Sequence, residues 1–161
     1  DFDDLEVTHN TIQDVKRYGM NIGRGFGFKG IGNTITNANG TGIILGEGLT
    51  DVTLAHNEVT EVDFHGILLT DGVSVFTLTA NRTKNVNRAN GGYNHIHIVS
   101  GCKDGTITGN RTKGGTYKGD YSLYVTNTCT DIVRTGNVWK GGGSIRSVYD
   151  VGITTAGVDI A

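Results

Sequence analysis

Residues 52–70 read VTLAHNEVTEVDFHGILLT, and this stretch decides the fold because close variants of it recur along the whole chain. Its first half centres on an asparagine, and similar phrases surround five more asparagines at intervals of 23 to 29 residues. The six repeat positions are Asn10, Asn33, Asn57, Asn81, Asn110 and Asn137. A repeat of about 20 to 50 residues indicates a stacked or radial architecture, in which residues far apart in sequence become neighbours.

The second half of the stretch, GILLT, also recurs once after each asparagine. The apolar residues that anchor this second phrase are Met20, Ile43, Ile67, Ile96, Leu123 and Ile145. The distance from each anchor to the next asparagine is 13 or 14 residues, whereas the distance from asparagine to anchor ranges from 8 to 15. Because loops tolerate insertions and paired strands do not, we expect an exposed turn in the variable interval. Its longest forms lie within residues 84–98 and 113–125.

The repeated phrases predict short strands. VTLAHNEVT and GIILG alternate apolar residues with polar or small ones and are rich in Val, Ile and Thr. The chain has 26 glycines and no proline, which suits tight turns between strands whose N–H groups all donate hydrogen bonds. Strands that recur in one direction at this short interval must be parallel, and the gaps are too short for helical crossovers. We therefore predict an all-β parallel solenoid of about six coils, stacked about 4.8 Å apart.

Four columns of residues are apolar in almost every repeat, and we assign them to the core. The column five residues before each asparagine contains Leu5, Phe28, Val52, Phe76, Gly105 and Ile132. The anchors form the second column, and the third, two residues later, contains Ile22, Leu45, Leu69, Ile98, Val125 and Ser147. The fourth, six residues after the anchors, contains Phe26, Leu49, Val73, Cys102, Cys129 and Val151. Burying a large apolar side chain contributes about 1.5–3 kcal/mol.

We interpret the asparagine column as structural. Asparagine tolerates the left-handed backbone of a sharp bend, and its amide can bond to its own backbone or to the amide of the next coil. The two cysteines, Cys102 and Cys129, have the same separation as the anchors of their coils and should lie one above the other. We interpret them as buried thiols that act as small hydrophobes, although Cα atoms about 4.8 Å apart would also permit a disulfide.

The repeated phrases, above all VTLAHNEVT with GILLT, resemble the right-handed parallel β-helix proteins of the pectin-lyase-like superfamily. The resemblance covers nearly the whole chain and implies a right-handed β-helix. Members include polysaccharide lyases, glycoside hydrolases, uronan epimerases and bacteriophage tailspike depolymerases. The resemblance therefore implies a polysaccharide-binding or polysaccharide-degrading β-helix of a phage tailspike or a secreted depolymerase, located outside the cell or on a virion. The alternative is a non-catalytic structural shaft or carbohydrate-binding module of a larger fibre.

The composition limits the other possibilities. The length suits one domain over residues 1–161, and the start at Asp1 looks like a cut edge of a longer or processed chain. Formal net charge is −2, so we expect no nucleic acid partner. No apolar stretch is long enough to span a bilayer, and we expect no membrane partner. Open solenoid ends need covering, so we expect adjoining domains or a homo-oligomer, and the resemblance to tailspikes makes that oligomer a trimer.

The enlarged turns are the predicted location of a binding site. They should stack into a wall beside the flat face of the second phrase, forming a groove for an extended polymer such as a polysaccharide. Alternation along the strand places His95 and His97 on the same outer face, with Tyr124 above His97. The substrate-binding candidates are therefore Arg88, Tyr93, His95, His97 and Tyr124. The competing interpretation is an ordinary solvated turn region.

A metal would need His95 and His97 together with a third ligand from Asp120 or His65, and we expect no metal and no cofactor.

Cleavage of a glycosidic bond by hydrolysis uses two carboxylates. Glu61 and Asp63 lie on one turn and should face Asp120 of the inserted wall, and we take these three as the catalytic candidates. A second possible set is Glu47 with Asp71, which are 24 residues apart and should be stacked. A lyase would instead need a base and a group that neutralises a uronate, for which Arg88, His95 and Lys118 are available. The sequence leaves hydrolase, lyase and non-catalytic interpretations open.

Overall fold

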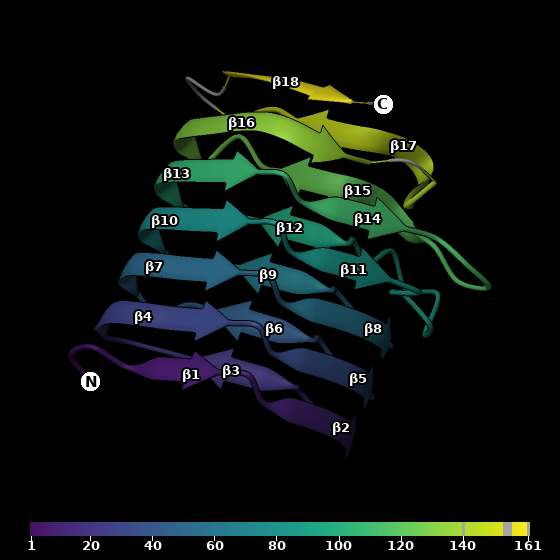
Figure 1. The fold of residues 1–161 in the computed structure, drawn as a ribbon. Coiled ribbons are helices and arrows are strands. Elements are labelled where there is room, and N and C mark those ends of the chain that lie inside the picture. The colour runs from purple at the N-terminus through teal and green to yellow at the C-terminus, as the bar shows by residue number, and fades with distance from the viewer. Residues whose placement is uncertain (140, 153–155, 161) are drawn as a thin grey trace.

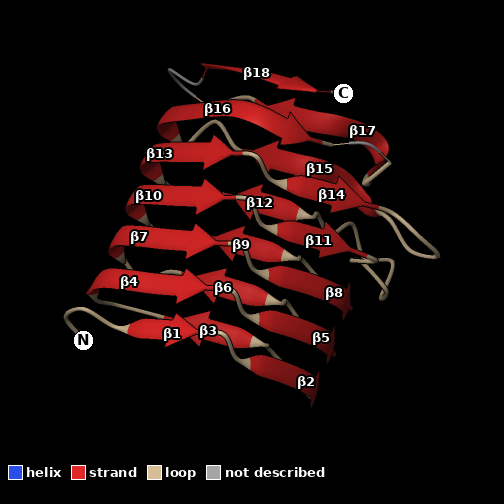
Figure 2. Cartoon of the chain, viewed as in Figure 1, coloured by secondary structure: helices blue, strands red, loops and turns tan. Residues whose placement is uncertain are grey.

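The computed structural model describes residues 1–139, 141–152 and 156–160. In this part of the chain all regular secondary structure is β-strand, wound into a parallel β-helix of about six coils (Figure 1, Figure 2). The predicted all-β solenoid is therefore confirmed. Among the same residues there is no helix long and apolar enough to cross a membrane.

The solenoid has three faces, and on each face the strands of successive coils stack on one another. The first face contains β1 (Glu6–Thr8), β4 (Phe26–Ile31), β7 (Thr50–Ala55), β10 (Ser74–Thr79), β13 (Lys103–Thr108) and the start of β16 (Thr130–Val138), which pairs with β18 (Ala156–Ile160). The second face contains β2 (Thr11–Val15), β5 (Thr34–Ala38), β8 (Glu58–Val62), β11 (Arg82–Lys84) and β14 (Arg111–Lys113). The third face contains β3 (Met20–Ile22), β6 (Ile43–Leu45), β9 (Ile67–Leu69), β12 (Ile96–Ile98), β15 (Gly119–Val125) and β17 (Gly143–Asp150). The first two faces form one sheet and the third face forms a six-stranded sheet.

The register confirms most of the predicted columns. Phe76 pairs with Val52 on one side and with Gly105 on the other, and Ile96 pairs with Ile67 and Leu123. The last anchor is wrong, because the residue that pairs with Leu123 is Val148.

The observed register also changes which residues of the last coil occupy the neighbouring columns. Ile145 is 60% exposed, and Asp150, not Ser147, pairs with Val125. Ile145 was predicted to be the anchor because the phrase around it resembles the phrases around the other anchors. The pairing of β17 with β15 instead determines which residue faces the core.

The fourth column also fails at both ends. Phe26 pairs with Thr50 and is 50% exposed, and Val151 at the other end is 44% exposed. The ring of Phe2 lies where a side chain at Gly25 would point, 2.7 Å from an added Cβ, and packs edge-on against Phe28. A residue from the N-terminal segment therefore fills the core place that the repeat assigned to Phe26.

The asparagines form a continuous ladder along the axis. In each coil the backbone N–H and the side-chain Nδ2 donate to Oδ1 of the asparagine in the next coil, at 2.9–3.1 Å. From Asn33 onward Nδ2 also donates to a backbone carbonyl of the preceding coil. The predicted amide stacking is confirmed, whereas the left-handed bend belongs to the preceding residue. Positive φ occurs at His9, Gly32, His56, Ala80, Gly109 and Gly136.

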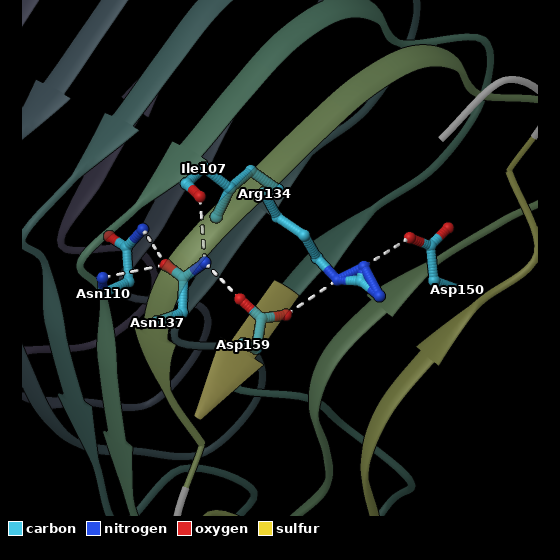
Figure 3. Close-up of polar contacts among 6 residues, drawn as sticks. All are labelled: Ile107, Asn110, Arg134, Asn137, Asp150 and Asp159. Carbon is cyan, nitrogen blue, oxygen red and sulfur yellow. Dashed lines mark hydrogen bonds and ion pairs between the residues drawn. The ribbon is translucent and has the colours of Figure 1, made fainter. Parts of the chain in front are cut away.

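The ladder ends at the carboxylate of Asp159, which the series of repeated asparagines did not predict. Asn137 Nδ2 donates to Asp159 Oδ1 at 2.8 Å (Figure 3). Asp159 is in turn 2.8 Å from Arg134 Nε, an ion pair without hydrogen-bond alignment, and Arg134 Nη1 donates to Asp150 at 3.1 Å. An ionised carboxylate accepts hydrogen bonds but has no proton to donate. Asp159 therefore accepts the hydrogen bond from Asn137 and cannot continue the amide ladder.

The cysteine pair lies as predicted. Lys103 pairs with Thr130, which places Cys102 beside Cys129 on adjacent coils. Both residues are buried and both thiols are free. The two side chains therefore contribute to the core as separate thiols.

We expect Gly105→Ala to destabilise the protein by about 1–3 kcal/mol, the usual cost of an overpacked core. The ring of Phe76 covers Gly105, and a Cβ there would lie 2.0 Å from that ring. Urea unfolding at neutral pH would measure the loss. Gly46→Ala is the matched control, since its Cβ would meet nothing closer than 3.3 Å. Adding Phe76→Leu to Gly105→Ala should recover part of the loss, and no recovery would contradict the steric explanation.

Candidate functional site

The two enlarged turns stack into a wall, as the sequence predicted. They connect the second face to the third, and both protrude beside β11 and β14 (Figure 1). Asp120 N–H donates to the carbonyl of Tyr93 at 2.8 Å, and Tyr121 N–H donates to Asn94 Oδ1 at 3.1 Å. Asn87 Nδ2 reaches the carbonyl of Lys118 at 3.2 Å. These bonds make the turns of the fourth and fifth coils one unit.

Asp63 and Arg88 form a partly buried ion pair on this wall. Arg88 Nε donates to Asp63 Oδ1 at 2.8 Å, and its Nη1 donates to Asn37 Oδ1 at 2.6 Å. A third, longer contact joins Nη2 to Asn39 Oδ1 at 3.5 Å. Arg88 therefore links three successive coils, and its guanidinium is held in place by these contacts.

The other two catalytic candidates have separate partners. Glu61 accepts a hydrogen bond from Asn85 Nδ2. Asp120 accepts a long bond of 3.5 Å from Asn87 Nδ2 and lies beside Gly92. Asp120 thus lies on the wall, whereas Glu61 on β8 and Asp63 directly after β8 lie in the neighbouring third coil, and each carboxylate is bound to a different side chain. In the described residues no three His, Cys, Asp or Glu side chains gather as a metal site would need.

A row of rings runs along the outer surface of the third face. His97 pairs with Leu68 and Tyr124 in the sheet, so the three side chains point outward in one column. We call the following side chains the aromatic row: Tyr93, His65, His97, Tyr124 and Tyr149. Their successive ring centroids are 5.0, 4.7, 5.0 and 4.8 Å apart. The predicted binding residues Tyr93, His97 and Tyr124 therefore lie together.

Hydrogen bonds fix the tautomers of the two histidines in the row. Asn94 N–H donates to His65 Nδ1 at 2.9 Å, so the proton of neutral His65 is on Nε2, which faces His97 Nδ1 at 3.4 Å. Burial, together with the neighbouring His97, lowers the pKa of His65 to about 3, and burial lowers the pKa of His97 to about 4. Both imidazoles are therefore neutral near pH 7. Because His65 Nε2 carries a proton, this pair is unsuited to binding a metal between its facing nitrogens.

His95 does not lie on the outer face, and this corrects the sequence analysis. It is fully buried, with Nδ1 2.8 Å from Thr83 Oγ1 and Nε2 3.0 Å from the carbonyl of Gly142. Gly66 occupies its position in the coil below, and a Cβ there would meet the carbonyl of His95 at 2.5 Å. The chain turns a corner immediately before Ile96, so strand alternation does not extend to this residue. The glycines that precede earlier anchors were the available signal for a crowded interior position.

The sequence analysis missed a basic groove on the outside of the second face. It has a volume of about 510 Å³ and is lined by Glu58, Thr60, Arg82, Thr83, Lys84, Arg111, Thr112, Lys113, Gly114, Gly115, Lys118, Val138 and Gly141. The available signal was the phrase NRTK, which occurs at residues 81–84 and again at 110–113. The formal net charge did not reveal this concentration of positive charge, because the acidic residues other than Glu58 lie elsewhere.

Comparisons with known proteins identify the fold. No family model matches the sequence, and no curated protein matches it. Among solved structures, the chain is similar to the A-module of the mannuronan C-5 epimerase AlgE6 from Azotobacter vinelandii, with a TM-score of 0.59 and 13% sequence identity. The match covers 99% of this chain and 55% of that one, so this chain spans about half the length of the epimerase module. At this identity the likeness supports the parallel β-helix fold alone.

Proposed function

We propose that this β-helix binds an extended polysaccharide along its third face, beside the wall of inserted turns. The observation that carries the proposal is the aromatic row, which follows the solenoid axis over successive coils. Tyrosine rings present apolar surface together with a hydroxyl, which suits stacking against sugar rings. The neutral histidines add flat ring surface without charge, and Arg88 provides a cation at the wall. Support also comes from the similar fold of a module that is named for its action on mannuronan.

The proposed reaction is cleavage of a glycosidic bond, by hydrolysis or by elimination. Glu61, Asp63 and Asp120 are the candidate acid and base groups, because Asp120 lies on the wall and the other two lie in the coil next to it. Arg88 would neutralise a uronate carboxylate in an elimination. In this proposal the chain is part of a phage tailspike or a secreted depolymerase, works outside the cell or on a virion, and forms a trimer.

A second candidate function is a non-catalytic shaft or carbohydrate-binding module of a larger fibre. One observation favours it. Each of the three carboxylates is bound to its own partner, Asn85, Arg88 or Asn87, whereas glycosidic cleavage needs two carboxyl groups on either side of one bond. Binding without cleavage would follow from this arrangement.

We expect the double variant His97→Ala, Tyr124→Ala to bind polysaccharide at least about tenfold more weakly, because it removes two rings from the row. Affinity electrophoresis against a panel of capsular and plant polysaccharides would measure binding, and reducing-sugar and unsaturated-uronate assays would measure cleavage. Phe26→Ala is the control for losing an exposed ring, since Phe26 is half exposed and lies on the first face.

The outcomes separate the two candidate functions. Product from the parent protein that disappears in Glu61→Gln, Asp63→Asn or Asp120→Asn supports a depolymerase. Binding without product from any polysaccharide supports the module. If no polysaccharide in the panel binds, or if Phe26→Ala weakens binding as much as the double variant, the aromatic row is not a sugar-binding surface.

A further inference from the structure

The basic groove concentrates positive charge in a chain whose formal net charge is −2. Among the described residues, five cationic side chains and one carboxylate line it. The cations are Arg82, Lys84, Arg111, Lys113 and Lys118. All five are exposed, and none forms a side-chain ion pair or hydrogen bond with another described residue, in contrast to Arg88 and Arg134. The groove therefore offers unpaired cations to a ligand.

The register places like charges directly beside each other. Arg82 pairs with Arg111 across β11 and β14, and Lys84 pairs with Lys113. Like charges at opposed positions of neighbouring strands destabilise a sheet. Nothing in the fold needs this arrangement, because the buried residue between them, Thr83 or Thr112, supplies the core contact. Glu58 lies beside Arg82 on its other side and offsets part of this cost, whereas Arg111, Lys84 and Lys113 have no carboxylate at a paired position of β8, β11 or β14, so a bound anion would relieve the remaining repulsion.

The groove is long in the direction of the solenoid axis. Its lining begins at Glu58 on β8, continues through β11 and β14, and reaches Val138 and Gly141 in the coil above. Four coils about 4.8 Å apart give a length of roughly 14 Å. One simple anion would need only one pair of cations, so the length favours a polymer that carries a negative group at intervals.

Small residues keep one side of the groove open. Gly114 and Gly115 of the inserted turn line it, and Gly114 N–H donates to the carbonyl of Gly141 at 2.8 Å. A Cβ at Gly115 would lie 2.0 Å from Asn85 Oδ1, so this turn packs closely on the residue that holds Glu61. The wall therefore separates the basic groove on one side from the aromatic row on the other.

We propose that the basic groove is a second binding site, for an acidic polysaccharide whose carboxylate or sulfate groups contact the stacked arginines and lysines. Arginine binds such planar or tetrahedral oxyanions with two parallel hydrogen bonds, and lysine adds point charges. The described lining residues include no aromatic side chain, which argues against a single-stranded nucleic acid, whose bases need stacking partners. The site shares no lining residue with the aromatic row and stands independently of the function proposed for it.

The test is binding of the whole chain to polygalacturonate, as the carboxylate probe, and to dextran sulfate, as the sulfate probe, measured by calorimetry at low and high salt. Neutral dextran and a single-stranded oligonucleotide are the comparison ligands. We expect at least one of the acidic probes to bind, more weakly as salt rises. Arg82→Ala, Arg111→Ala should reduce that affinity at least about tenfold.

The control variant is Lys16→Ala, Lys103→Ala, which removes two charges outside the groove and should change the affinity less than about twofold. The aromatic-row variant His97→Ala, Tyr124→Ala should leave this binding unchanged, so the two proposals can fail separately. The preference between the two acidic probes identifies the anionic group. The proposal is overturned if neither acidic probe binds at low salt, if the control variant weakens binding as much as the arginine variant, or if the oligonucleotide binds more tightly than both.

Discussion

Asn81→Ala is expected to reduce the free energy of unfolding by about 3–5 kcal/mol, because it interrupts the asparagine ladder in its fully buried centre. Oδ1 of Asn81 accepts from both the backbone N–H and Nδ2 of Asn57, and its Nδ2 donates to the carbonyl of Leu54 and to Asn110. Alanine would leave the Asn57 N–H buried without its acceptor and would remove the side-chain donor from the Leu54 carbonyl. Each unsatisfied buried group costs about 1–3 kcal/mol.

Urea unfolding followed by circular dichroism would measure this loss. Asn10→Ala is the matched control, because it removes the same side chain at the exposed end of the same ladder. Asn10 donates only to Thr8 and Asn33, so its loss should cost no more than about 1 kcal/mol. Equal losses in the two variants would contradict the view that burial of the amide ladder, rather than each local bend, stabilises the coils.

Acidification is expected to destabilise the protein between about pH 6.5 and pH 4, because buried His95 and half-buried His65 and His97 remain neutral in the folded state in this range. Burial lowers the pKa of His95 to about 4, against 6.5 for a free histidine. The unfolded chain therefore binds more protons than the folded one as the pH falls through this window, and stability falls with it. One pKa unit corresponds to 1.36 kcal/mol, so His95 alone accounts for about 3 kcal/mol lost by pH 4.

His65 and His97 add to the same trend, since burial lowers their pKa values to about 3 and about 4. Urea unfolding at pH 7, 5.5 and 4 would measure the dependence. The readout is the difference between the parent protein and His95→Gln, which should lose less stability on acidification, because carboxylates protonate in both. His56→Gln, at an exposed histidine, is the control and should keep the full dependence. An unchanged dependence in His95→Gln would contradict the role given to His95.

The predicted site was partly recoverable from the sequence. His97 and Tyr124 could be placed together because strand alternation and repeat spacing fix outward positions within β12 and β15. Tyr93 and Arg88 could be assigned to the inserted turn, and Asp63 to the turn that faces it, because the repeat length varies only in that interval. Their mutual ion pair, and the separate partners of Glu61 and Asp120, could not be predicted, because the conformation of an inserted turn depends on which neighbouring turns it touches.

Two wrong predictions show where the repeat pattern no longer predicts the position of a side chain. His95 was expected outside because alternation was extended one residue beyond the strand, across a corner where two successive side chains point inward. Ile145 was taken as an anchor because it is apolar and stands in a similar phrase, although pairing with Leu123 selects Val148. The basic groove was overlooked because net charge is a sum over the chain and says nothing about which charges the coils bring together.

The sequence by itself determined the stacked coils, the asparagine ladder, the adjacent cysteines and most of the core. The physical reason is that parallel strands of one repeat have a single register in which every apolar column is buried and every amide has a partner. Only the tertiary structure decided the burial of His95, the partners of the candidate carboxylates, the end of the ladder at Asp159 and the gathering of five cations around the basic groove. These features depend on corners, insertions and contacts between coils. At such places the repeat no longer fixes the backbone, and contacts with neighbouring side chains determine the arrangement.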